Sequence, residues 1–147
     1  MEISENYITR NQRSLLRIYS NLQRQSNELS NLGLDEICNK IMDGMDDLEE
    51  LLLSAGIEAY PEDHDEKLAE AWSWLCDMYK AVGQEVNGEK RIYRVKLREH
   101  LKALGWKNHA IGNAFRDEPS RPMARLMDAG YIKVHGQLYW SIHKEVM

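Results

Sequence analysis

The sequence has no apolar run that approaches the roughly 18 residues needed to suggest a membrane span. Its first residues, MEISENYITR, lack the basic segment and apolar stretch of a signal peptide, which predicts a cytoplasmic protein with no membrane partner. Cysteine is scarce, and Cys38 and Cys76 form no CxxC pair and no metal-ligand spacing. A disulfide framework and a thiolate zinc site are therefore not expected.

Sequence motifs of catalysis are missing as well. The chain contains no GxxxxGK[ST], GxGxxG, HExxH or GxSxG pattern. The acid-rich run EDHDE at 62–66 lies at an expected helix start, where carboxylates favour the helix dipole, so helix capping is preferred over metal binding. We therefore expect no enzymatic activity, no catalytic residue, no metal and no cofactor.

What the sequence does have is an uneven distribution of charge. The net charge of the 147 residues is −5, but residues 1–87 hold 7 Lys and Arg against 18 Asp and Glu, whereas residues 88–147 hold 12 against 6. A basic segment of this size suits a polyanion such as double-stranded DNA, because binding releases counterions from the phosphates. The alternative is a chance split of surface charge within a single domain.

Apolar periodicity predicts a helical N-terminal part. Helices are expected at 5–32 and 35–54, joined at Gly33 into an antiparallel hairpin, followed by a third helix at 64–82. The first two helices carry stripes at coiled-coil-like spacing. These stripes are Leu15, Ile18, Leu22, Leu29 and Leu32, and then Leu34, Ile37, Ile41, Met45, Leu48 and Leu52.

The third helix is apolar on two flanks, so it needs two surfaces to bury them. Trp72 and Leu75 lie on the flank expected to face the hairpin, whereas Trp74 and Met78 lie on the other. Packing within the chain is one way to cover the second flank. A two-fold dimer is the other, and we expect a homodimer with Trp74 and Met78 in its interface.

The segment VGQEVNGEK at 82–90 contains two glycines and the turn-prone pair Asn87-Gly88, and it coincides with the change of charge. A domain boundary is therefore expected there. It would separate an acidic helical module for dimerisation or partner binding, residues 1–84, from a basic domain at 89–147.

The basic part is expected to contain a strand at 91–95, three helices and a β-hairpin around Gly136. A three-residue turn, 135–137, would pair Val134 with Leu138 and Ile132 with Trp140. This order, and the phrase RLMDAGYIKVHGQLYW, resembles the winged helix-turn-helix superfamily over about residues 90–143. The resemblance implies a C-terminal winged helix with a small β-hairpin, in a DNA-binding transcription regulator of bacterial or phage type.

The resemblance also implies which residues contact DNA. The third helix of the family enters the major groove, and here Arg121 and Arg125 share one face of that helix. The start of the second helix, the following turn and the wing suit phosphate contacts. The expected DNA-binding residues are Lys107, Asn108, His109, Arg116, Ser120, Arg121, Arg125, Lys133 and His135.

A second interpretation is a protein-binding effector of the phage or mobile-element type. Its acidic helical region would block a basic site on a nucleic-acid-handling protein through Asp46, Asp47, Glu49 and Glu50. The solvated face of an amphipathic helix explains the same carboxylates without any partner.

Overall fold

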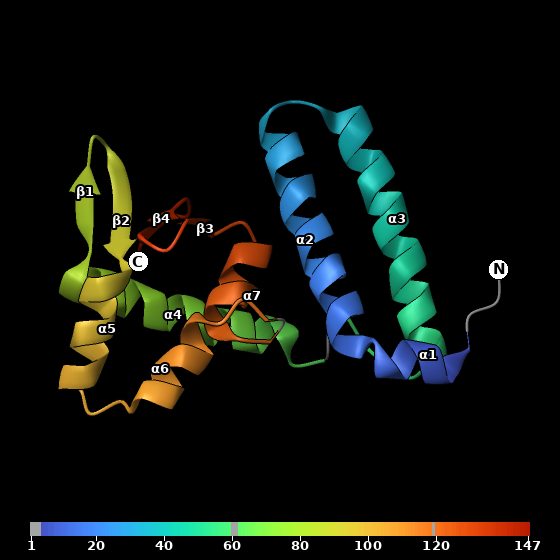
Figure 1. Cartoon of the computed structure of the whole chain (residues 1–147). Helices are drawn as coiled ribbons and strands as arrows, with labels where there is room; N and C mark the ends of the chain where they lie inside the picture. The colour runs from blue at the N-terminus through green and yellow to red at the C-terminus, as the bar shows by residue number, and fades with distance from the viewer. Residues whose placement is uncertain (1–3, 60–61, 119) are drawn as a thin grey trace. The chain divides into compact units, whose positions relative to one another are not determined.

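The computed structural model describes residues 4–59, 62–118 and 120–147, and these residues are mainly helical (Figure 1). They form seven helices and a small antiparallel sheet of four strands near the C-terminus, which confirms the expected mainly α class. The chain divides into two compact units, residues 1–64 and 65–147.

The first unit is a helical hairpin preceded by a short helix. Its helices are α1 (Glu5–Arg10), α2 (Gln12–Asn31) and α3 (Asp35–Ser54). The single helix expected over 5–32 is interrupted at Asn11, whose side-chain Nδ2 donates a hydrogen bond to the Tyr7 carbonyl oxygen at 2.8 Å. The turn between α2 and α3 uses Gly33 at φ 77°, as expected for a residue that ends a helix in the left-handed region.

The core of the first unit lies at the α1 end of the hairpin, where Ile8, Leu52 and Ile57 are buried. The predicted stripe of α3 is confirmed at Met45 and Leu52, which are also buried. The predicted stripe of α2 is not buried: its five apolar residues remain half-buried or exposed. Ser26 of α2 faces α3 instead, with its Oγ 3.1 Å from Cys38 Sγ.

The second unit packs four helices around the small sheet. Trp72, Leu75, Leu97, Leu126 and Trp140 are among the buried residues of its core. The strand order is β1-β2-β4-β3, and every neighbouring pair is antiparallel. Along the chain the elements are α4 (His64–Val82), β1 (Gln84–Val86), β2 (Glu89–Tyr93), α5 (Arg94–Ala103), α6 (Asn108–Phe115), α7 (Pro122–Asp128), β3 (Ile132–His135) and β4 (Tyr139–Ile142).

The contacts do not divide the chain at the predicted boundary of 82–90. Helix α4 belongs to the second unit, because Ala71, Trp72 and Cys76 join the same buried cluster as the sheet. The expected linker is itself a β-hairpin, in which Val86 pairs with Glu89. Its two-residue turn, Asn87-Gly88, has φ values of 52° and 80°, as a type I′ turn requires.

The register of the C-terminal hairpin also differs from the prediction. Val134 pairs with Trp140 and Ile132 with Ile142, so the turn is one residue later, at 136–138. Leu138 lies in this turn and is 60 % exposed. This register keeps Trp140 and Ile142 on the core face and places Tyr139 opposite His135, on whose ring it stacks.

Candidate nucleic-acid interface

Two arginines at the start of α5 lie against a shared aromatic wall. The Arg94 Cζ is 4.7 Å from the centroid of the Trp140 ring, and the Arg98 Cζ is 5.5 Å from the centroid of the Phe115 ring. Phe115 and Trp140 themselves meet edge to face, with centroids 5.1 Å apart. The rings therefore hold two half-buried guanidinium groups by cation–π contacts.

The charges of this pair are not balanced by carboxylates. Residues four apart on a helix are neighbours, and like charges there destabilise it by roughly 0.2–0.5 kcal/mol. Burial, and secondly the positive charge of Arg98, lower the pKa of Arg94. Within the described parts of the chain, no carboxylate forms an ion pair with Arg94 or Arg98. An anion bound here would relieve the repulsion between them.

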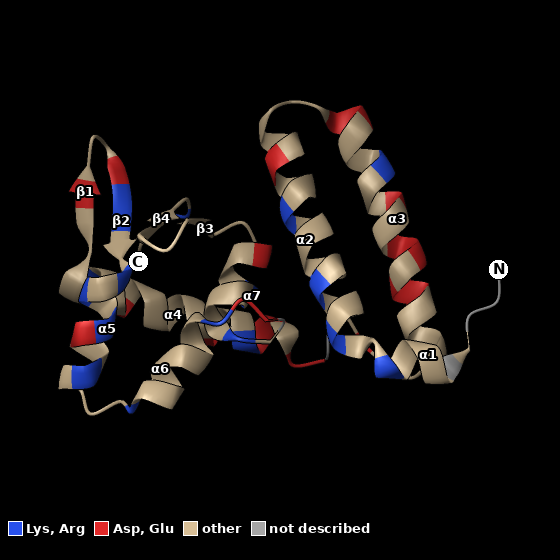
Figure 2. Cartoon of the chain, in the orientation of Figure 1, with Lys and Arg blue, Asp and Glu red and all other residues tan. Residues whose placement is uncertain are grey.

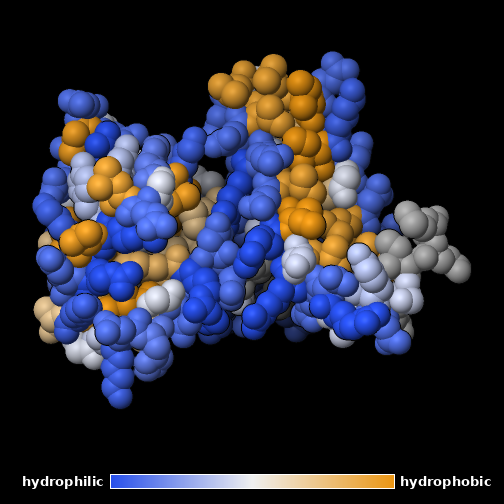
Figure 3. Space-filling model, viewed as in Figure 1, coloured by the Kyte–Doolittle hydropathy of each residue, from blue (hydrophilic) through white to orange (hydrophobic). Residues whose placement is uncertain are grey.

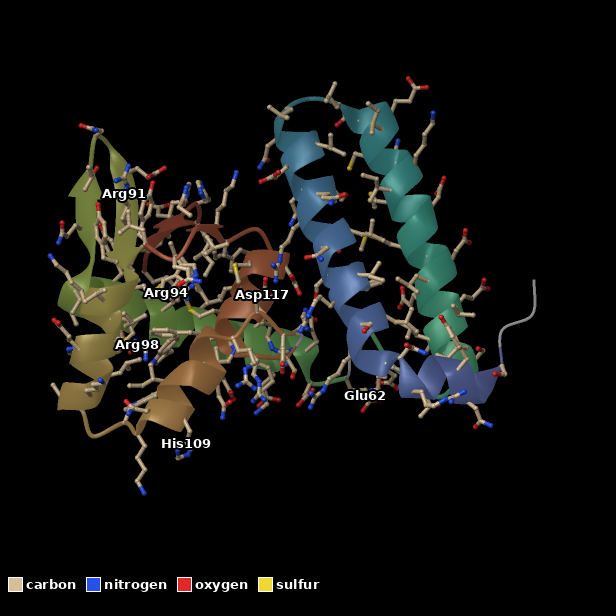
Figure 4. All side chains as sticks on the ribbon, in the orientation of Figure 1. Glu62, Arg91, Arg94, Arg98, His109 and Asp117 are labelled. Carbon is tan, nitrogen blue, oxygen red and sulfur yellow. The ribbon has the colours of Figure 1, made fainter. Side chains whose placement is uncertain are left out.

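A third arginine, Arg91, precedes this pair on β2. Its Nε donates to Glu89 Oε1 at 2.7 Å, its Nη1 donates to the Tyr93 hydroxyl at 3.2 Å, and its Cζ lies 4.3 Å from the Tyr139 ring centroid. The hydrogen bond to Tyr93, followed by that to Glu89, raises the pKa of Arg91. Figure 4 labels the three arginines, which follow one another from β2 into α5.

The outer face of the sheet continues from Arg91 as a ladder of polar and aromatic side chains. Tyr139 stacks on His135 with centroids 4.5 Å apart. Ser141 Oγ lies 2.7 Å from Nε2 of both His135 and His143, and the serine is completely buried. The hydroxyl therefore orients the two imidazoles and is not presented to a substrate. Among the residues predicted from sequence, His135 belongs to this ladder, and Lys133 is exposed within β3, where it pairs with Ser141.

Arg125, a predicted base reader, does not lie on an exposed face of α7. It is 8 % exposed, its Nη2 donates to the Ser120 carbonyl oxygen at 3.4 Å, and it lines a cavity of about 220 Å³ with Trp74 and Trp106. Residues 123–127 of α7 are all buried, because α4 and the sheet enclose a helix of only seven residues. The prediction that Arg121 and Arg125 form one exposed face is wrong for Arg125.

The other predicted DNA-binding residues lie at helix ends. Arg121 is the N-cap residue of α7, and its Nε is 3.8 Å from Glu118 Oε2. Arg116 approaches the same carboxylate, with its Nη1 3.9 Å from Glu118 Oε1. Their shared carboxylate reduces the positive charge between α6 and α7. The remaining members are exposed: Lys107, Asn108 and His109 at the N-terminus of α6, and Ser120 before α7.

The flank of α4 that predicted a dimer is covered within the chain. Met78 is 8 % exposed in the core of the second unit, and Trp74 stacks on Trp106 with ring centroids 6.1 Å apart. The uncovered flank was the reason to expect Trp74 and Met78 in a dimer interface. The structure removes that reason, because the segment after α4 folds back over it.

The acidic residues predicted to bind a protein partner lie on α3. Asp46, Asp47 and Glu50 are exposed, and Glu49 is half-buried. Figure 2 shows acidic residues along α3 in red. In the described ranges, no group of three or more His, Cys, Asp and Glu side chains could hold a metal ion. The three exposed carboxylates follow one helix and form an extended acidic surface on α3.

The sequence reasoning missed Arg91, Arg94 and Arg98. Their spacing of three and then four residues was visible in the sequence, and it predicts neighbouring side chains where a helix begins. What the sequence did not show is the aromatic wall, because Phe115 and Trp140 come from α6 and β4.

No described helix is long and apolar enough to cross a membrane. No protein-family model, no curated protein and no solved structure matches the chain.

Proposed function

We propose that this is a DNA-binding regulatory protein whose second unit is a winged helix. The order of β2, α5, α6, α7, β3 and β4 supports this, as does the arrangement of the C-terminal hairpin beside β2. In a winged helix, three helices precede a hairpin that lies next to a short first strand. The regulatory role is an analogy with that architecture, since a fold by itself does not determine function.

The observation that carries the proposal is the Arg94–Arg98 pair on its aromatic wall. Guanidinium groups bind phosphate oxygens well, and aromatic contacts fix their positions before a ligand arrives. A like-charged pair without partner carboxylates lowers the stability of α5. Binding of a polyanion would explain why the chain contains such a pair. Contacts of this kind position a protein on the sugar–phosphate backbone and carry no sequence information.

Base reading through Arg125 is not part of this proposal, because the side chain is buried. Arg121 at the N-cap of α7 is the remaining arginine of that helix, and it is half-buried beside Glu118. The binding we propose therefore depends mainly on phosphates and on salt concentration.

The test is a double variant, Arg94→Gln with Arg98→Gln, measured by fluorescence anisotropy on a duplex of mixed sequence. We expect an affinity loss of at least about tenfold near 50 mM salt and a salt slope lower by about two, since each phosphate contact contributes roughly 0.9. The matched control is Lys67→Gln with Lys80→Gln, which removes the same charge from α4. Equal losses in both variants, or no DNA binding by the wild type at low salt, would contradict the proposal.

A protein-binding effector is the second candidate, and the observation that favours it is the carboxylate surface of α3. Three of the four predicted residues, Asp46, Asp47 and Glu50, are exposed and available to a basic partner. Charge reversal at Asp47 would slow the association of such a partner, and the loss of association rate would be largest at low salt. This reading gains support if the purified chain has no affinity for DNA.

A further inference from the structure

The α2–α3 hairpin carries an apolar face that is exposed in the single chain. Ile18 on α2 and Ile37 on α3 are each 48 % exposed, whereas Leu32 and Leu34 at the turn are 74 % and 44 % exposed. Figure 3 shows apolar atoms over this turn and along the hairpin below it. Contiguous apolar patches are uncommon on monomers and mark interaction surfaces. This hairpin face consists of Ile18, Leu22, Leu29, Leu32, Leu34, Ile37 and Ile41.

The hairpin face explains why the predicted stripe of α2 is not buried. Its residues recur at steps of three and four, with polar Gln25 at the one missing position, which is the spacing of a helix that packs against other helices. Cys38 and Ser26 face each other between α2 and α3, so the stripe lies to one side of their contact. In two antiparallel helices, the residues to this side of the contact on α2 and on α3 point to the same side of the hairpin, so they form one face.

Gly44 makes a notch in this face. It follows Ile37 by seven residues and Ile41 by three, so it lies on the same side of α3. A Cβ at this position would meet nothing within 4 Å, so packing within the described chain does not require glycine. Glycine in the middle of a helix is unfavourable relative to alanine, but it lets another helix approach closely.

The two helices of the hairpin differ in net charge. Helix α2 contains three arginines and one glutamate, whereas α3 contains seven carboxylates and one lysine (Figure 2). We propose that the hairpin face binds a second copy of this chain in a two-fold dimer, with α2 of each copy against α3 of the other. That pairing places the more basic helix opposite the acidic one twice, whereas α2 against α2 would not.

The charge pattern also selects the direction of the two-fold axis. An axis parallel to the helices brings α2 of one copy opposite α3 of the other and keeps both turns at the same end. Leu32, the most exposed of the large apolar residues, then lies at the same end of the dimer as its equivalent and faces the start of α3 of the second copy. Two hairpins joined in this way form a four-helix bundle.

The first test is the mass of the full-length chain by sedimentation over a range of concentrations. We expect a dimer at tens of micromolar and a dissociation constant at least about 100-fold higher for Ile37→Asp, because a carboxylate would be buried in the bundle. The control is Met42→Asp, which adds the same charge at a 50 % exposed position about 140° around α3. A monomeric wild type at about 100 µM, or equal effects of the two variants, would overturn the proposal.

Gly44→Ala separates a role in the dimer from a role in folding. Measured at a concentration where the chain is monomeric, the substitution should raise the unfolding temperature by about 4–8 °C, because alanine favours the helix. The same methyl group should raise the dimer dissociation constant by about tenfold by filling the notch. An unchanged dissociation constant would overturn the close approach of helices at Gly44.

A cysteine cross-link tests the direction of the axis. A bifunctional thiol reagent should join Leu32→Cys between two full-length copies, because both turns lie at one end of the bundle. Leu53→Cys, at a 52 % exposed position on the side of α3 away from the hairpin face, is the control and should stay largely uncrosslinked. The native thiols of Cys38 and Cys76 are buried and should not interfere. Failure of Leu32→Cys to cross-link a chain that is dimeric would overturn the arrangement.

Discussion

At the scale of single residues, Arg125 shows how burial changes the meaning of a side chain. Sequence alone places it beside Arg121 as a DNA contact, whereas in the structure its guanidinium reaches the Ser120 carbonyl oxygen beneath α4. Its aliphatic stem fills space between α4 and α7. Its role in this structure is therefore to support the packing of α7.

We predict that Arg125→Ala lowers the free energy of unfolding by about 1–3 kcal/mol, because it removes a buried stem and its hydrogen bond. Arg125→Met should lose less stability, since methionine keeps most of the aliphatic part of the arginine side chain. Thermal and chemical unfolding measure both variants, with the exposed Arg116→Ala as a control expected to change stability by less than about 0.5 kcal/mol. Wild-type stability in Arg125→Ala, together with altered DNA sequence preference, would restore the original reading.

At the scale of elements, the β1–β2 hairpin turns an expected linker into part of the fold. Its turn places both Asn87 and Gly88 at positive φ, which asparagine tolerates better than most residues. The hairpin adds β1 to the edge of the sheet that holds Arg91. The segment should therefore unfold with the second unit and not as a flexible connection.

We expect Asn87→Val to destabilise the second unit by about 1–2 kcal/mol, because a β-branched residue resists the left-handed conformation. Asn87→Gly should be close to neutral. Chemical denaturation followed by tryptophan fluorescence reports on this unit, since Trp72 and Trp140 lie in its core. If both variants unfold like the wild type, the turn does not hold the hairpin in solution.

At the scale of the whole molecule, the two units have opposite charge. Residues 1–64 contain five Lys and Arg against thirteen Asp and Glu, whereas residues 65–147 contain fourteen against eleven. The acidic unit should repel DNA from the same chain that binds it. The repulsion between the acidic unit and DNA weakens with added salt, because exposed charges more than about 10 Å apart are screened at 0.1 M ionic strength.

Neutralising two exposed carboxylates, Asp46→Asn with Glu50→Gln, should therefore raise DNA affinity by about two- to threefold at low salt. The gain should vanish at high salt. Anisotropy titrations at both salt concentrations measure it. A fall in DNA affinity would show that α3 contributes directly to binding, and loss of association with a basic protein would favour the effector.

Local sequence patterns determined much of the helical structure. The expected bounds of α3 and α4 agree with the structure, because each helix has its own apolar periodicity and its own end signals. The same patterns predicted that Ile132, Val134 and Trp140 share one face of the C-terminal hairpin, as they do, whereas Leu138, expected on that face, lies in the turn. Periodicity acts within a few turns of helix or a few residues of strand, so the sequence displays it directly.

Only the tertiary structure decided which surface covers each apolar flank. Helix α4 has two such flanks, and the sequence does not state that both are buried in the second unit with α7 and the sheet. The same packing buries Arg125 and brings Phe115 and Trp140 to Arg94. These outcomes depend on contacts between segments far apart in the chain, where burial of the largest apolar area overrides local preference.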